Sequence, residues 1–435
     1  MADNLTQKGN GTVATDEVGG IHYQLIKPCY GEDGEKNMVS KVRPLPVILN
    51  NDLNTSFLGR TRVSEEEFIF NSKLLKGKES LYWSEKISGS ATSVHSSVDT
   101  SVTMSVSANA ESVIRQTKNR FIYEPGKKQR FIFSCNFNSG VASTTKRVGC
   151  YDGVDGCFFE TNGTTFRIGI SKNSTISYTN QSSFNLDTID GNGNSGYNMD
   201  LSKIQVFVIE YLWLGASGVK FGVLNGDDAI YFHQYIANNI ETSVYMTNPN
   251  LPIRYEISSS GGASSFEQIC CSVSSEGGYA KNGRIISIST GTTAVDADIA
   301  GQSYPILGVR LKSDHINTFC VPKIFDIMCT TNDNFRYFLC INPTISGTFT
   351  YNDLDDSNLQ YAIGTSSNEV TDDGYVILEG YESSQVRSTS SNIDLFNNIS
   401  IGEDLNSNRD ILCLCVTPLS PGADIYASLT LKINQ

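Results

Sequence analysis

The sequence is poor in the residues and motifs that most catalytic and metal sites use. Its four histidines lie outside any H-E-x-x-H motif, and it has no G-x-S-x-G elbow and no Walker A lysine. No histidine stands beside a serine or cysteine motif that would suggest a catalytic triad. These absences predict a protein that is not an enzyme and that has no catalytic residues, no bound metal and no cofactor.

Long apolar runs and clusters of positive charge are also missing. A membrane helix needs ~18 apolar residues, whereas the longest apolar-rich run, residues 204–214, is shorter and contains Glu210. The formal net charge is -13, and the basic run at residues 127–130 is short. Nucleic-acid binders normally show a basic footprint, so we expect neither nucleic-acid binding nor membrane insertion. The polar N-terminus lacks the apolar core of a signal peptide, which predicts folding in a cytoplasm.

Cysteine is present, with 11 residues, but not in a metal-binding pattern. No C-x-x-C pair occurs, and most of the cysteines lie in apolar, strand-like runs. This favours buried apolar thiols over a zinc site. Cys150 and Cys157 bracket a Gly/Asp-rich turn, which predicts a hairpin with one thiol on each arm. In an oxidising environment such a pair is placed to form a disulfide.

One loop imitates two ligand-binding motifs. Residues 191–196 match G-x-G-x-x-G, but no helix is expected after them to hold a pyrophosphate. Asp190, Asn192 and Asn194 resemble the start of a calcium loop, although Ser195 and Leu201 stand where glycine and glutamate are needed. An ordinary Asx-rich turn is the preferred interpretation.

What the sequence does contain is a repeated strand pattern. Phe131, Phe133, Cys135 and Phe137 alternate with polar residues and should share one face. Residues 204–214 are typical of a central strand, and residues 219–223 and 230–233 of a hairpin. Many short strands with turns every ten or so residues predict a mostly β protein. We expect two antiparallel β-sandwich domains of jelly-roll type with an extended N-terminal arm.

Four regions are expected along the chain. Residues 1–60 form the arm, which docks on another protein. Residues 61–110 contain a short helix at residues 64–68, with Ser64 as its N-cap, and then an extended connector rich in Ser, Thr and Val. Residues 111–258 form a β-sandwich, and residues 259–435 form a second β domain after the Ser/Gly-rich boundary.

Two stretches resemble structural proteins of tailed phages of the head-fibre and tail-fibre kind. The first is GNGTVATDEVGGIHYQ at residues 9–24, with its Thr-Asp-Glu-Val-Gly-Gly core. The second spans residues 123–257, with YEPGK at 123–127, YLWLG at 211–215 and VYMTNPNLPIRYEI at 244–257. Together they cover somewhat over a third of the chain. The family offers no catalytic residues for comparison.

The resemblance implies a structural virion protein, either a capsid decoration or head fibre or a tail appendage. It would be made in the host cytoplasm and would assemble with other capsid or tail proteins, and virion symmetry favours a homo-oligomer such as a trimer. The expected assembly residues of the arm are Asp16, Glu17, Gly19, Gly20, His22 and Tyr23. Two alternatives remain open: a module that binds host surface glycans, and a polysaccharide depolymerase.

Overall fold

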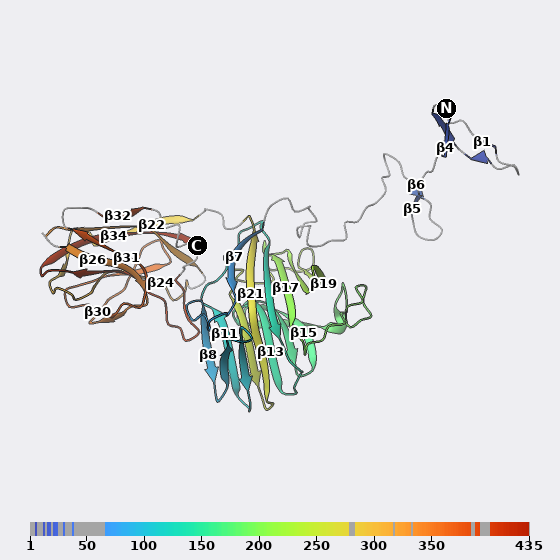
Figure 1. The fold of residues 1–435 in the computed structure, drawn as a ribbon, viewed down its shortest axis with the longest axis horizontal. Helices are drawn as coiled ribbons and strands as arrows, with labels where there is room; N and C mark the ends of the chain where they lie inside the picture. Colours follow the sequence, from blue (N-terminus) through green and yellow to red (C-terminus); the bar gives the residue numbers. More distant parts are fainter. Residues whose placement is uncertain are drawn as a thin grey trace. The chain divides into compact units, whose positions relative to one another are not determined.

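The computed structural model consists almost entirely of antiparallel β-structure, which confirms the predicted fold class (Figure 1). It describes the side chains of residues 66–277, 283–315, 318, 320–331, 334–383 and 401–433. For the short strands within residues 1–65, and for Phe319, Ser388–Ser391 and Asn434, it describes the backbone. Among the described residues, no helix is long and apolar enough to cross a bilayer.

The N-terminal unit, Met1–Asp52, contains three pairs of short strands. They are β1 (Leu5–Thr6) with β2 (Thr12–Val13), β3 (Thr15–Val18) with β4 (Ile21–Gln24), and β5 (Cys29–Tyr30) with β6 (Asn37–Met38). In the second pair, Asp16 lies opposite Tyr23 and Glu17 opposite His22. Four of the predicted assembly residues therefore lie in one pair of strands, but their side chains, and Gly19 and Gly20, lie outside the described residues.

Two sheets form the first sandwich, which is built from residues 66–276. The eight-stranded sheet has the order β19 (Asp228–Ile236), β18 (Gly218–Asn225), β17 (Gln205–Leu212), β12 (Gln129–Asn136), β21 (Ser264–Glu276), β10 (Ser101–Val106) and β9 (Thr92–Ser96), with β7 (Glu66–Ser72) also paired to β21. The seven-stranded sheet has the order β16 (Thr175–Asn180), β15 (Thr165–Lys172), β14 (Gly156–Asn162), β13 (Thr144–Tyr151), β20 (Ile253–Ser259), β11 (Glu111–Thr117) and β8 (Trp83–Ser88). A short 3-10 helix, η2 (Gln181–Ser183), follows β16.

The core of this sandwich is aromatic and lies between the two sheets. Phe131, Phe133 and Cys135 all point into it from β12, as the alternation predicts. Phe133 meets Tyr255 of the opposite sheet edge to face, with 6.4 Å between ring centroids. The predicted central strand is β17, which lies between β12 and β18, and the predicted hairpin is β18–β19.

Three features of the predicted organisation differ in the structure. At residues 66–68 the predicted helix is replaced by β7, because Glu66–Ser72 pairs with β21 and Arg130 binds the Glu66 carboxylate at 2.8 Å. Ser64, the predicted N-cap, lies outside the described residues. The extended connector is confirmed as strands but not as a connector, because it forms the hairpin β9–β10, whose Val102, Met104 and Val106 are buried in the core. The boundary at residue 258 is a turn from β20 in one sheet to β21 in the other, so this sandwich ends only after Glu276.

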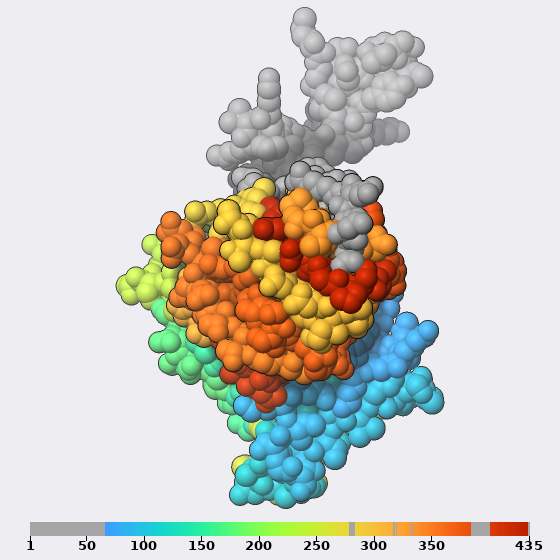
Figure 2. Space-filling model, turned by 90° about the vertical axis from the view of Figure 1, so that its left-hand side faces the viewer, coloured from blue at the N-terminus to red at the C-terminus, as the bar shows by residue number. Residues whose placement is uncertain are grey.

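The second sandwich is built from residues 284–434, and part of its surface, coloured yellow to red, is seen in Figure 2. One sheet has the order β22 (Arg284–Ser289), β34 (Ala423–Asn434), β25 (Phe319–Cys329) and β32 (Ser388–Ser391), with β23 (Val295–Ala297) on β34. The other has the order β28 (Asn352–Asp353), β29 (Leu359–Ile363), β24 (Tyr304–Leu311), β33 (Leu412–Pro418), β26 (Asn334–Ile341) and β31 (Tyr375–Ser383). A separate hairpin pairs β27 (Thr344–Ser346) with β30 (Glu369–Asp372).

Two basic side chains are enclosed within the first sandwich. Arg115 is fully buried; its Nε donates to Gln268 Oε1 at 2.6 Å, its Nη2 donates to the Lys78 carbonyl at 3.0 Å, and its Nη1 binds the Glu85 carboxylate. Lys146 is also buried, and its ammonium donates to the carbonyls of Phe137 and Ser139. Burial lowers the pKa of Lys146 to about 8.

Candidate functional site

The outer face of the seven-stranded sheet carries a row of alternating charges. Register places Glu256 of β20 opposite Arg147 of β13, Arg147 opposite Glu160 of β14, and Glu160 opposite Arg167 of β15. Their neighbours Val148, Phe159 and Ile168 point the other way, into the core. Because side chains alternate across a strand, the row faces away from that core.

Glu160 is the centre of this row. Its carboxylate is fully buried, and both of its oxygens are occupied: Arg147 Nε binds Oε2, and Arg167 Nε donates to Oε1 at 2.6 Å. The side chains of Arg147 and Arg167 remain 22% and 20% exposed. Arg147 Nη2 also donates to the Tyr178 hydroxyl at 3.0 Å, and Arg167 Nη2 binds Glu160 as well. The buried carboxylate therefore fixes the direction of two guanidiniums that remain partly exposed.

An aromatic layer lies beside the charges. Tyr151 and Phe158 are buried outside the main core, with 4.8 Å between their ring centroids. Phe158 is flanked in register by Gly149 and Gly169, and a Cβ at Gly169 would lie 2.4 Å from its ring. The glycine therefore gives the ring the space that it fills. Tyr178 of β16 is 38% exposed, and the Arg167 guanidinium lies 3.6 Å from its ring centroid.

The network continues across β20. Arg254 pairs with Glu256 at 3.1 Å and lies over the Tyr151 ring, and the Tyr151 hydroxyl donates to Glu256 at 3.2 Å. Burial, together with the nearby Glu256 carboxylate, raises the pKa of Tyr151 well above its usual value. The hydroxyl therefore stays protonated and acts as a donor. We call this surface the Arg–Glu face; its members are Arg147, Tyr151, Phe158, Glu160, Arg167, Tyr178, Arg254 and Glu256.

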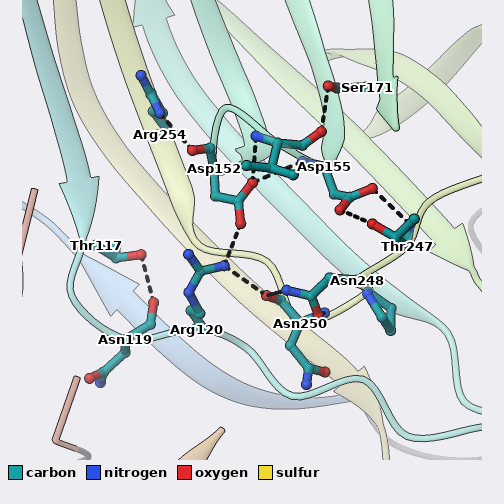
Figure 3. A network of polar contacts seen from close by, with 12 residues as sticks. Thr117, Asn119, Arg120, Asp152, Asp155, Ser171, Thr247, Asn248, Asn250 and Arg254 are labelled. Carbon is teal, nitrogen blue, oxygen red and sulfur yellow. Dashed lines mark hydrogen bonds and ion pairs between the residues drawn. The ribbon is translucent and has the colours of Figure 1, made fainter. Parts of the chain in front are cut away.

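At one end of the Arg–Glu face, the turn between β13 and β14 is fastened by polar contacts (Figure 3). Asp152 accepts from the backbone N–H groups of Val154 and Asp155, both at 2.9 Å, and pairs with Arg120 at 2.7 Å. Arg254 donates to the Asp152 carbonyl at 2.9 Å. The buried Asp155 accepts from the backbone N–H of Thr247 at 2.7 Å. The carboxylates of this turn are thus used to hold the loop in place.

The outer face of the eight-stranded sheet has a comparable ion-pair row. Glu210 of β17 lies opposite Arg130 of β12 and accepts from its Nε at 2.6 Å and from Lys128 at 2.8 Å. This row offers matched control positions, because it has the same charge pairing on a different surface.

The loop motifs singled out in the sequence form turns. Asp190 accepts from the Thr188 hydroxyl at 2.6 Å and from the Asn192 N–H at 3.0 Å, as in the predicted Asx turn. Within the described part of the chain, no group of three His, Cys, Asp or Glu side chains is arranged to hold a metal ion. Cys150 and Cys157 lie directly opposite each other on the predicted hairpin, buried, with their sulfurs 3.2 Å apart.

None of the residues of the Arg–Glu face was identified as functional from the sequence. The signal that was available is the alternation of charged and apolar residues, as in Phe166–Arg167–Ile168, which marks a solvent-facing position. The register between β20, β13, β14 and β15 is what brings the charges into one row. That register was not predicted.

No family model and no curated protein matches this chain, whereas solved structures do. A glycoside hydrolase family protein from Mycobacterium thermorestibile matches with a TM-score of 0.34 and 12% identity, covering 47% of this chain and 99% of that one. An endo-β-1,4-glucuronan lyase from the fungus Trichoderma reesei matches with a TM-score of 0.33 and 7% identity over 48% and 95%. The CBM2 module of an evolved Dit from Lactobacillus casei BL23 phage J-1 matches with a TM-score of 0.31 and 9% identity over 49% and 96%. At these identities the likeness concerns the fold alone.

The prediction that the protein is not an enzyme is corrected by these matches. Proteins named as a glycoside hydrolase and a lyase are among those with a similar strand arrangement. The prediction rested on missing motifs, but the paired carboxylates of glycosidases are defined by their separation in space. The missing motifs therefore give no ground for excluding catalysis.

Proposed function

We propose that this chain binds polysaccharide on the Arg–Glu face and does so as a component of a tailed-phage particle. The observation that carries the binding proposal is the pair of partly exposed guanidiniums held in fixed directions by the buried Glu160. Burying the Glu160 carboxylate is costly, and its ion pairs add little to stability by themselves. Donors that are oriented before the ligand arrives lose less entropy on binding.

The chemistry of this face suits sugars. Planar guanidinium groups donate to hydroxyl or carboxylate oxygens in pairs. Glu256, with a side chain 16% exposed, supplies an acceptor, and the exposed ring of Tyr178 supplies an apolar surface for sugar C–H groups. A few oriented polar groups beside aromatic surface are typical of ligand sites.

Arginine substitutions on the Arg–Glu face should weaken binding to polysaccharide. We expect Arg167→Ala to lower the affinity for a bound polysaccharide roughly tenfold or more, because each hydrogen bond to a charged group contributes about 1.5–3 kcal/mol. The measurement is binding to a panel of immobilised bacterial capsular and cell-wall polysaccharides. Arg130→Ala, which breaks the pair with Glu210 on the other sheet, is the matched control and should leave binding unchanged. An equal loss of polysaccharide affinity in Arg167→Ala and Arg130→Ala, or no binding by the unaltered protein, would contradict the proposal.

Cleavage of the polysaccharide is a second candidate, favoured by the carboxylates of Glu160 and Glu256 on one face. They lie on strands that both pair with β13, so their backbones are about 10 Å apart. New reducing ends in the binding samples, lost in Glu256→Gln, would identify cleavage.

The particle location is supported by residues 9–24 and 123–257, which resemble tailed-phage structural proteins. The second stretch contains the whole Arg–Glu face. The chain would assemble there with capsid or tail proteins and with further copies of itself.

Immunogold labelling of purified, washed phage particles tests the location. We expect label on the capsid or on a tail appendage, with the protein present by mass spectrometry. Its absence from washed particles would contradict the location and would leave the binding result unaffected.

A further inference from the structure

The second sandwich holds two arginines that share one neutral acceptor. Arg310 lies in β24, opposite Gln360 of β29, and Arg409 shortly precedes β33. Arg310 Nε and Arg409 Nη1 both donate to Gln360 Oε1, at 2.8 and 3.0 Å. Two positive charges therefore meet at an uncharged oxygen.

The surroundings do not neutralise this pair. Asp353 lies opposite Gln360, but it accepts from Gln360 Nε2 at 2.8 Å. Glu403 lies opposite Arg409 in an isolated β-bridge. Among the described residues, neither arginine forms an ion pair, whereas Arg336 of the same sandwich pairs with Asp373 and Glu379. Burial and the neighbouring Arg409 charge lower the pKa of Arg310.

The geometry also keeps the two guanidiniums in fixed positions. Arg310 lies over the Tyr351 ring, 3.9 Å from its centroid. Arg409 Nη1 donates to the Leu311 carbonyl at 3.0 Å. Both side chains are only partly buried. In the described part of the chain, the Nη1 and Nη2 groups of Arg310 have no hydrogen-bond acceptor.

We infer that Arg310 and Arg409 bind the carboxylate of an acidic sugar. A carboxylate accepts two parallel hydrogen bonds from a guanidinium and supplies the negative charge that this pair lacks. The anion site follows from the geometry of the second sandwich alone. The choice of a sugar as its carrier rests on the proposed function.

Substitution of the shared acceptor gives the sharpest test, because Gln360→Glu keeps the shape of the side chain and adds the missing charge. We expect this variant to bind glucuronate at least tenfold more weakly than the unaltered protein and to melt at a higher temperature. Arg310→Met should lose binding by a similar factor, and Arg336→Met, which removes an arginine that already has partners, should not. Isothermal titration with glucuronate, glucose and acetate measures these affinities.

The probes separate the possible outcomes. Binding of glucuronate and acetate but not glucose supports a carboxylate site, and tighter binding of glucuronate than acetate supports the sugar. Equal binding of glucose and glucuronate, no binding by the unaltered protein, or full binding by Gln360→Glu would overturn the inference. Arg167→Ala should not affect this titration, so failure of the Arg–Glu face and failure of this site are distinguishable.

Discussion

Replacing Arg115 by methionine is expected to lower the free energy of unfolding of the first sandwich by about 3–5 kcal/mol. Arg115 is fully buried and bonds to Gln268, Glu85 and the Lys78 carbonyl. Without the guanidinium, these groups lose their donor inside or at the edge of the sandwich, and a buried polar group without a partner is strongly destabilising. Methionine fills much of the same volume, so the effect measures the polar contacts more than a cavity.

Urea unfolding followed by tryptophan fluorescence measures this loss. Both tryptophans, Trp83 and Trp213, lie in the first sandwich, so the signal reports on that unit. Arg284→Met, at an exposed arginine of the second sandwich, is the control and should leave the midpoint unchanged. A midpoint for Arg115→Met within error of the unaltered protein would contradict the structural role.

Stability should rise with pH through the titration of Lys146. Its folded pKa is about 8 and its ordinary value is 10.5. Between these values the unfolded chain binds a proton that the folded chain does not, so the free energy of unfolding increases with pH in that window. Across this window the free energy of unfolding rises by about 3 kcal/mol. The contribution of Lys146 is least favourable to the folded state below pH 8.

Comparison with Lys146→Met isolates this effect from other groups that titrate at high pH. The variant loses the hydrogen bonds to Phe137 and Ser139, which is an offset that does not depend on pH. We expect the unaltered protein to gain stability relative to Lys146→Met between pH 7.5 and 10.5. A constant difference over that range would mean that Lys146 is not protonated differently in the two states.

The sequence predicted individual strands well and their partners poorly. The alternation of Phe131, Phe133 and Cys135 identifies β12 and its buried face, because side-chain period depends on local sequence alone. The helix predicted from residue 64 is absent at residues 66–68, because pairing of β7 with β21, almost 200 residues later, outweighs a local helix preference. The Ser/Gly turn after β20 has the composition of a linker, and only its strand partners reveal that it joins two sheets.

The candidate sites likewise depend on strand pairing, which the sequence did not predict. Arg147, Glu160 and Glu256 are ordinary polar positions in strands, and nothing in their spacing along the chain relates them. They lie in one row because β13 pairs with β14 on one side and with β20 on the other. In the same way, Arg310 and Arg409 are nearly a hundred residues apart and meet only through Gln360.

The position of β20 and β21 also determines when the first sandwich becomes able to fold. These are its last strands in the chain, yet each lies inside a sheet: β20 between β13 and β11, and β21 between β12 and β10. During synthesis, the hairpins β13–β14 and β17–β18 form from neighbouring residues, but both sheets stay split until residues 253–276 leave the ribosome. A nascent chain stalled before that point exposes open strand edges and apolar surface, the features that promote aggregation. The first sandwich can therefore complete both of its sheets only once about the last tenth of its residues has emerged from the ribosome.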